Sequence, residues 1–163
     1  MSEVTFPKVR RARETDAEEI VSWFPDRGSV VSWGSPHVPD PLDADWLARE
    51  FFAPGREHYV LTDVDDEPVG IFGIRFHARE RRAHLIRVAL SPEWRGLGLS
   101  GLLLKGATTL AREARALRLT LNVYGSNDVA RQAYERAGFF PYEFAQAPED
   151  STGTMIRMLK PLG

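Results

Sequence analysis

Residues 90–101 of the 163-residue chain read Leu90-Ser91-Pro92-Glu93-Trp94-Arg95-Gly96-Leu97-Gly98-Leu99-Ser100-Gly101. An apolar run ends at Leu90 and an amphipathic pattern begins at Leu99, so this stretch joins a predicted strand to the start of a predicted helix. Glycines there allow backbone N–H groups to point into one space without side chains in the way. The helix start adds a partial positive charge of roughly half a unit, which makes the turn suitable for binding phosphate. Arg95 can add a charge-assisted hydrogen bond.

Two other interpretations of this turn are open. The glycines can serve chain reversal alone, or they can belong to a dinucleotide site, because Gly96, Gly98 and Gly101 match the fingerprint G-x-G-x-x-G. That fingerprint expects a strand that runs straight into the glycines and an acidic residue at the end of the next strand. Here residues 92–95 intervene, and the next predicted strand ends in Asn-Val-Tyr at 122–124. A P-loop is excluded, since no Gly-Lys-Ser/Thr follows.

Regular patterns extend outward from this turn on both sides. Small and apolar residues at helical spacing predict a helix over 99–114, and alternation over 117–123 predicts a half-buried strand. Further strands are predicted at 4–12, 59–62, 69–76, 83–90, 139–144 and 154–159, with a hairpin turn at 65–68. A capping box of Thr15 and Glu18 predicts a short helix that buries Ile20, Val21 and Phe24 and is ended by Pro25. Helices are also predicted at 44–52 behind Asp43 and from Asn127 to Gly138, with a loop over 25–42. This order predicts one α/β or α+β domain over residues 1–163.

The composition excludes several classes of protein and site. The formal charge is −2, which is too balanced for a nucleic-acid binder or a polybasic membrane anchor. No segment approaches the ~18 apolar residues of a membrane span, and the first ten residues lack an apolar signal core, so we predict a cytoplasmic protein. The chain has no cysteine, which removes disulfides, thiolate metal sites and a cysteine nucleophile. His37, His58 and His77 have no metal-site spacing, and we predict no metal.

Two segments resemble the signatures of the GNAT N-acetyltransferase family. Residues 95–100 resemble its coenzyme A pyrophosphate loop, Gln/Arg-x-x-Gly-x-Gly/Ala, with Ser100 departing at the last position but remaining small. Residues 127–139, Asn-Asp-Val-Ala-Arg-Gln-Ala-Tyr-Glu-Arg-Ala-Gly-Phe, are similar to the second signature, Asn-x-x-Ala-x-x-x-Tyr-Glu-x-x-Gly-Phe. The resemblance is specific over 83–140. It implies a mixed, mostly antiparallel sheet flanked by helices, with acetyl-CoA as co-substrate and direct transfer of the acetyl group to a primary amine.

The resemblance also implies a V-shaped opening between strands 83–90 and 117–123, into which the pantetheine arm of the coenzyme runs. A backbone N–H near Val88 or Ala89 would polarise the thioester carbonyl. Purely structural roles are alternatives to these coenzyme contacts. Asn127 can be a plain helix cap, and Arg131 can lie on a solvated helix face. Coenzyme contacts are implied for Val88, Leu90, Arg95, Gly96, Leu97, Gly98, Leu99, Ser100, Gly101, Asn127 and Arg131.

Two side chains are implied as catalytic. Tyr134, a phenol with a pKa near ~10, would hold or supply a proton as the thiolate leaves, although its position also suits a buried aromatic. His84 aligns with a glutamate that serves as base in some family members, and an imidazole with a pKa near ~6.5 suits that task. Glu143 is a weaker alternative for the base.

The acceptor amine is expected between residues 25–45 and 143–153. An acidic and aromatic rim there would suit a cationic amine, although each residue taken singly also fits a solvated loop or a packed lid. We expect the acceptor to be a small molecule or a peptide, and the protein to be a monomer or a homodimer. The alternative to an enzyme is a non-catalytic module that senses acyl-CoA. The rim residues are Asp26, Trp33, His37, Asp40, Asp43, Asp45, Glu149 and Asp150.

Overall fold

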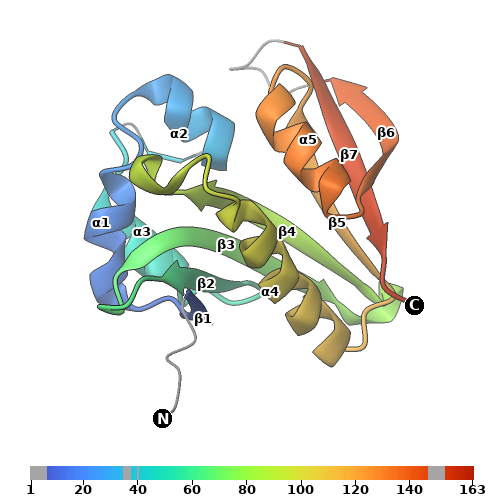
Figure 1. Cartoon of the computed structure of the whole chain (residues 1–163), viewed down its shortest axis with the longest axis horizontal. Helices are drawn as coiled ribbons and strands as arrows, with labels where there is room; N and C mark the ends of the chain where they lie inside the picture. The colour runs from blue at the N-terminus through green and yellow to red at the C-terminus, as the bar shows by residue number, and fades with distance from the viewer. Residues whose placement is uncertain (1–6, 35–37, 40, 147–152) are drawn as a thin grey trace.

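A seven-stranded sheet organises the molecule (Figure 1). The structure is a computed structural model that describes residues 7–34, 38–39, 41–146 and 153–163. The strand order is β1-β2-β3-β4-β5-β7-β6, and every neighbouring pair is antiparallel except β4 and β5. The predicted fold class, a mixed and mostly antiparallel sheet flanked by helices, is therefore confirmed. The strands are β1 (Lys8–Arg11), β2 (Glu57–Thr62), β3 (Pro68–His77), β4 (Arg82–Leu90), β5 (Arg118–Tyr124), β6 (Phe140–Gln146) and β7 (Thr154–Pro161).

Helices cover both faces of the sheet, and each face has its own core. One core joins α4 and α5 to β3, β4, β5 and β7, and the other joins α1, α2 and α3 to β2 and β3. No helix in the described parts of the chain is long and apolar enough to cross a membrane. The helices are α1 (Ala17–Val21), α2 (Arg27–Gly34), α3 (Ala44–Glu50), α4 (Leu99–Glu113) and α5 (Asp128–Arg136), and the 3-10 turns are η1 (Glu14–Asp16), η2 (Ala78–Glu80) and η3 (Pro92–Trp94).

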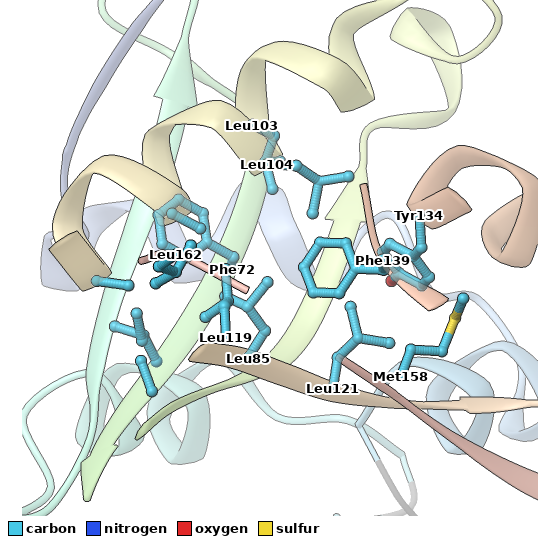
Figure 2. Packing of buried hydrophobic residues seen from close by; sticks show 14 of the residues in the cluster. Phe72, Leu85, Leu103, Leu104, Leu119, Leu121, Tyr134, Phe139, Met158 and Leu162 are labelled. Atoms are coloured by element: carbon cyan, nitrogen blue, oxygen red, sulfur yellow. The ribbon is translucent and has the colours of Figure 1, made fainter. Parts of the chain in front are cut away.

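The core under α4 and α5 follows the alternation predicted for β5, and Leu119 and Leu121 are buried with Leu103 of α4 (Figure 2). The buried face of α4 is turned by about one residue from the predicted helical stripe, because Leu104 is buried and Leu102 is 43 % exposed. Each buried leucine contributes roughly 1.5–3 kcal/mol by leaving water. Tyr134 of α5 packs edge-on against Phe139, with ring centroids 5.9 Å apart (Figure 2). The apolar face of α5 is thus fixed against the sheet.

Two predictions for the first fifty residues are wrong. Residues 27–34 form α2 rather than a loop, because Asp26 Oδ1 accepts a hydrogen bond from the Ser29 N–H at 2.8 Å and starts the helix. The capping box is also displaced, since η1 begins at Glu14 and Asp16 accepts from the Arg13 N–H at 2.7 Å. Asp43, by contrast, caps α3 as predicted.

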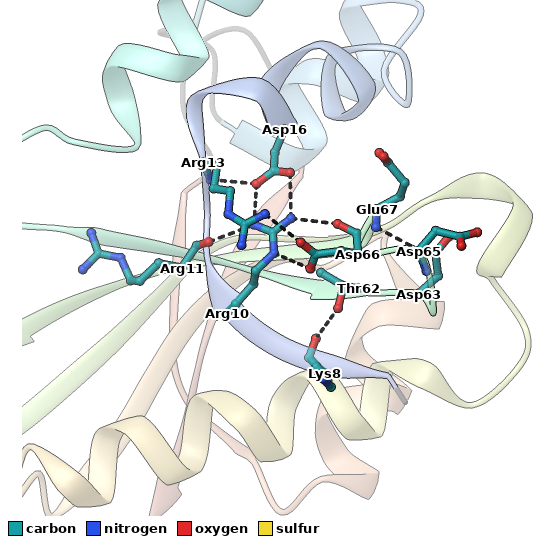
Figure 3. A network of polar contacts seen from close by, with 10 residues as sticks. All are labelled: Lys8, Arg10, Arg11, Arg13, Asp16, Thr62, Asp63, Asp65, Asp66 and Glu67. Atoms are coloured by element: carbon teal, nitrogen blue, oxygen red, sulfur yellow. Dashed lines mark hydrogen bonds and ion pairs between the residues drawn. The ribbon is translucent and has the colours of Figure 1, made fainter. Parts of the chain in front are cut away.

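A polar network fastens β1 to the hairpin between β2 and β3 (Figure 3). Arg10 donates two hydrogen bonds to Asp16, at 2.8 and 3.0 Å, and another to Asp66 at 2.9 Å. Arg13 also donates to Asp66, at 2.6 Å. The hydrogen bonds from Arg10 and Arg13 hold the pKa of Asp66 below its usual value. The predicted hairpin at 65–68 is confirmed, and this network holds the edge strand against it.

Candidate functional site

The central opening lies where β4 and β5 part. The two strands pair only over Arg82–Leu85 and 118–121, and every residue from Ile86 to Leu90 is half-buried. A pocket of about 550 Å³ fills the opening. Its lining comes from β4, β5, α5, α2 and α3, so both cores contribute to one site. The opening lies where the family resemblance implies one.

A β-bulge at Arg87 turns β4 away from a regular ladder. Ile71 of β3 pairs with Ala89 of β4, and Gly73 pairs with Ile86. One residue therefore lies between the pairs on β3 and two on β4, which is the extra residue of a bulge. Arg87 has φ +55°, a left-handed conformation that is uncommon for any residue but glycine. Its carbonyl accepts a hydrogen bond from Trp33 Nε1 at 2.9 Å, which ties α2 to the bulge.

The Arg87 side chain holds together three elements beneath the pocket. It donates to Glu50 of α3 at 2.9 Å and to His58 Nε2 of β2 at 3.0 Å, and it lies over the ring of Trp46. Arg56 donates to the same carboxylate at 2.8 Å. Burial alone would raise the pKa of Glu50, but the hydrogen bonds from both arginines outweigh it and lower that pKa. The sequence analysis missed this network, although an arginine within the run Leu-Ile-Arg-Val-Ala at 85–89 is a signal for a buried partner.

His58 is fully buried in this network as a neutral imidazole. Burial, reinforced by the Arg87 charge, lowers its pKa to about 3. Since Nε2 accepts from Arg87, Nδ1 carries the proton, and within the described ranges no group accepts from it. A folded-state pKa below the ordinary 6.5 means that only the unfolded chain binds a proton between about pH 6.5 and 3.

The free energy of unfolding should therefore fall as the pH falls below 6.5. His58 alone accounts for about 1.4 kcal/mol per pH unit, or about 2 kcal/mol between pH 6.5 and 5. His58→Gln keeps an acceptor for Arg87 but removes the titration, so its slope should be shallower by that amount. Urea unfolding at a series of pH values measures both slopes. Equal slopes in the two proteins would mean that His58 is protonated in the folded state.

The glycine turn precedes α4 and leaves backbone donors free. Gly96 and Gly98 have φ +77° and +78°, and a Cβ built on either meets nothing within 4 Å. The N–H groups from Gly96 to Gly98 have no backbone acceptor in the described chain, and the first N–H groups of α4 have none within the helix. The space beside both glycines is therefore open, and the turn carries several backbone donors without an acceptor. Arg95 is exposed beside them and donates from Nε to the Leu90 carbonyl at 3.2 Å.

Tyr134 and His84 both line the central pocket. Tyr134 is 9 % exposed, and its hydroxyl has no hydrogen-bond partner in the part of the chain that is described. Burial raises the pKa of Tyr134 to about 12, so the phenol stays protonated. His84 Nδ1 lies 2.7 Å from the Thr120 hydroxyl, and burial, with the nearby charges of Arg82 and Arg75, lowers the pKa of His84 to about 4. His84 is therefore neutral at pH 7.

Four further predicted site residues divide into two groups. Val88 and Asn127 line the same pocket, and Asn127 also caps α5 by accepting from the Ala130 N–H at 3.2 Å. Arg131 lies outside the lining, donating to the Gly125 carbonyl and pairing with Asp128. Glu143 is exposed on β6, in an ion pair with Arg157 at 2.8 Å and away from the pocket.

The predicted acceptor rim is only partly described. Trp33 lines the pocket, whereas Asp26 and Asp43 cap helices. The one acid in the described lining is Glu50, which is already paired with two arginines. Within the described ranges, no three His, Asp or Glu side chains are placed to hold a metal ion. Outside those ranges lie His37, Asp40, Glu149 and Asp150.

Comparison with curated proteins finds acetyltransferases. The chain is similar to a Bacillus subtilis protein provisionally named as the alanine N-acetyltransferase of ribosomal protein bS18, with 31 % identity over 101 residues, which is 62 % of this chain and 66 % of that protein. It is also similar to the mycothiol acetyltransferase of Corynebacterium aurimucosum, with 30 % identity over 128 residues, which is 74 % of this chain and 40 % of that protein. The matches thus span less than two thirds of the length of these relatives.

Comparison with solved structures and family models agrees with the fold. The spermidine N-acetyltransferase of Vibrio cholerae, solved in complex with CoA and spermine, superposes with a TM-score of 0.79 at 18 % identity, covering 95 % of each chain. A model described as the Acetyltransferase (GNAT) family matches residues 17–139, which include the glycine turn, the parted strands and Tyr134. The chain therefore belongs to the GNAT acetyltransferase family.

Proposed function

We propose that the protein transfers the acetyl group of acetyl-CoA to a primary amine of a small molecule. The observation that carries this proposal is that Tyr134 and His84 line the same pocket, which lies where β4 and β5 part. A thioester that entered between the strands would meet a protonated phenol and a neutral imidazole. Curated and solved relatives named for mycothiol and spermidine support a small acceptor.

The glycine turn would hold the coenzyme pyrophosphate, and the parted strands would hold its pantetheine arm. The backbone of Ile86 to Leu90 has no strand partner on the β5 side, so its polar groups are available to an extended ligand. Arg95 would give up its hydrogen bond to the Leu90 carbonyl and donate to a phosphate oxygen instead. A hydrogen bond between two charged groups is stronger than one to a neutral carbonyl. When bound, acetyl-CoA supplies a thioester whose carbonyl carbon an amine can attack.

Two side chains of the protein would carry out the proton transfers. Tyr134 keeps its proton on Oη and would donate a hydrogen bond to the sulfur position as the thiolate leaves. His84 offers an uncharged nitrogen to the amine, and its lowered pKa makes it a transient carrier that passes the proton on to solvent. A backbone N–H at Val88 or Ala89 would polarise the carbonyl oxygen. Trp33 and Trp46 would shape the acceptor side of the pocket.

A protein amino terminus is the second candidate acceptor. The similarity to the Bacillus subtilis protein named for an alanine of bS18 favours it. Acetylation of an alanine-initiated peptide in preference to small amines would establish that alternative. We also propose that the protein is a monomer or a homodimer.

Acetyl-CoA should stabilise the protein, and substitution of Gly98 should weaken that effect. At about 100 times its Kd, a ligand adds roughly 2.7 kcal/mol, a rise in Tm on the order of 5–10 °C for a chain of this size. Gly98→Ala places a methyl group in the open space beside the free N–H groups. Tenfold weaker binding would reduce the added stability to roughly half.

Gly55→Ala is the matched control. Gly55 also has a left-handed φ, +86°, and a Cβ there meets nothing within 4 Å, but it precedes β2 rather than α4. Both variants should lose a similar stability, about 1 kcal/mol, through strain. Only Gly98→Ala should lose part of the acetyl-CoA shift. A shift with NAD instead, or no shift in the unmodified protein, would overturn the proposed coenzyme site.

A further inference from the structure

A second pocket lies at the other end of α4 from the glycine turn. It has a volume of about 450 Å³ and is formed by η2, the start of β4, the end of α4 and the segment that leads into β5. Four arginines line it together with His77, and its lining contains no acidic residue. The arginines are Arg81, Arg82, Arg112 and Arg115.

The positive charge of this pocket is largely uncompensated. Arg82 pairs with Glu80 at 2.9 Å, but no carboxylate lies within ion-pair distance of Arg81, Arg112 or Arg115 among the described residues. The whole chain has a net charge of −2, so a cationic pocket at one end is a local concentration rather than a general property. Arg112 also compensates the negative end of the α4 dipole, which does not explain the other arginines.

Two left-handed turns position the backbone around this pocket. Arg81 and Arg115 have φ +50° and +64°, and they are two of the four described residues other than glycine with positive φ. The turn at Arg81 is fixed, since its carbonyl accepts from the Leu117 N–H at 2.7 Å, and the Leu117 carbonyl accepts from the Leu162 N–H at 2.9 Å. Both residues follow a helix end, Arg81 after η2 and Arg115 after α4, where a left-handed residue commonly ends the helix.

Apolar side chains complete the lining. Phe76, Leu117 and Leu162 lie between the arginines, so the pocket offers an apolar surface as well as guanidinium groups. Guanidinium groups match phosphate oxygens in a bidentate geometry, and an apolar surface suits the organic part of a metabolite.

We propose that this pocket binds a small phosphorylated molecule at a site separate from the coenzyme site. The fifteen residues of α4 span roughly 22 Å, which separates the two. A single ligand of the volume of this pocket does not reach both. The proposal does not depend on acetyl transfer.

Inorganic pyrophosphate is the probe that tests the proposal by isothermal titration calorimetry. The unmodified protein should bind it, and the double variant Arg112→Gln/Arg115→Gln should bind at least tenfold more weakly. Arg79→Gln removes an exposed arginine of η2 that is not in the lining, so it should bind like the unmodified protein. Far-UV circular dichroism and the Tm without ligand check that all variants are folded.

Further measurements distinguish binding at this pocket from binding at the glycine turn. They also distinguish a small phosphorylated ligand from a nucleic acid. Gly98→Ala should retain pyrophosphate binding, and the double variant should retain the Tm shift with acetyl-CoA. Loss of pyrophosphate binding in Gly98→Ala would place the phosphate at the glycine turn and overturn the proposal. No binding by the unmodified protein, equal binding by the double variant, or binding of a DNA oligonucleotide without binding of pyrophosphate would overturn it as well.

Discussion

Tyr134→Phe should lower kcat by roughly 10²-fold or more while the affinity for acetyl-CoA stays nearly unchanged. The hydroxyl is the one polar atom of a side chain otherwise buried between α5 and the sheet, and no described group bonds to it. Its removal therefore leaves no partner unsatisfied, and the ring contacts with Phe139 persist. The loss falls on the chemical step alone. Steady-state kinetics with an accepted amine, together with calorimetry of acetyl-CoA, measures the two quantities separately.

Tyr142→Phe is the control for this substitution. Tyr142 is exposed on the edge strand β6, away from the pocket, so the same loss of a hydroxyl should leave kcat unchanged. Full activity in Tyr134→Phe would remove Tyr134 from the mechanism and direct the search for a proton donor to other pocket groups. Binding of acetyl-CoA without turnover of any amine by the unmodified protein would instead favour the sensor alternative.

Glu50→Gln should reduce the free energy of unfolding by about 3 kcal/mol. The Glu50 side chain is 17 % exposed, and its carboxylate is the anion shared by Arg87 and Arg56, so neutralising it leaves two guanidinium groups without a counter-charge. Arg87, at 10 % exposure, cannot regain its hydration by a simple rotation. For a chain of this size the expected fall in Tm is about 6–12 °C. Thermal and urea unfolding at pH 7 measure it.

Glu143→Gln removes an exposed carboxylate of the same kind and serves as the control. Its ion pair with Arg157 has a similar length, 2.8 Å, but both side chains are more than 40 % exposed. Such pairs contribute between zero and about 1 kcal/mol. If the two variants lost equal stability, the network beneath the pocket would have no special role in holding α3 and β2 to the bulge.

Local signals in the sequence were sufficient for most of the fold. The alternation of Leu119 and Leu121, the helical pattern before Glu113 and the Asp43 cap each act within a few residues. The strand, the helix and the cap are confirmed, although the buried face of α4 is one residue away from the predicted stripe. The helix over 27–34 was missed because glycines and prolines near it outweighed the one local signal, Asp26 with Ser29. Its stability comes from packing against distant elements, such as the bond from Trp33 to Arg87, which no local window contains.

The candidate site was predictable where its residues belong to contiguous motifs. The glycine turn and the segment from Asn127 to Tyr134 carry fixed spacings, so their residues could be named from the sequence. The buried group of Glu50, His58 and Arg87 comes from three separate elements, and the bulge that joins them depends on the β3–β4 register. Sequence periodicity assigns residues to faces of a strand but does not reveal where a ladder slips by one residue.

The short ladder between β4 and β5 has a further consequence for how the molecule holds together. The β4–β5 ladder, with four residue pairs, joins the β1–β4 half of the sheet to the β5–β7 half. Along the chain, α4 connects the two halves. A molecule that bonds to both strands beyond Leu85 also clamps the two halves to one another. Occupancy of the site and cohesion of the sheet are then linked by mass action. Ligand binding would therefore extend the connection between the two halves beyond the four pairs of the β4–β5 ladder.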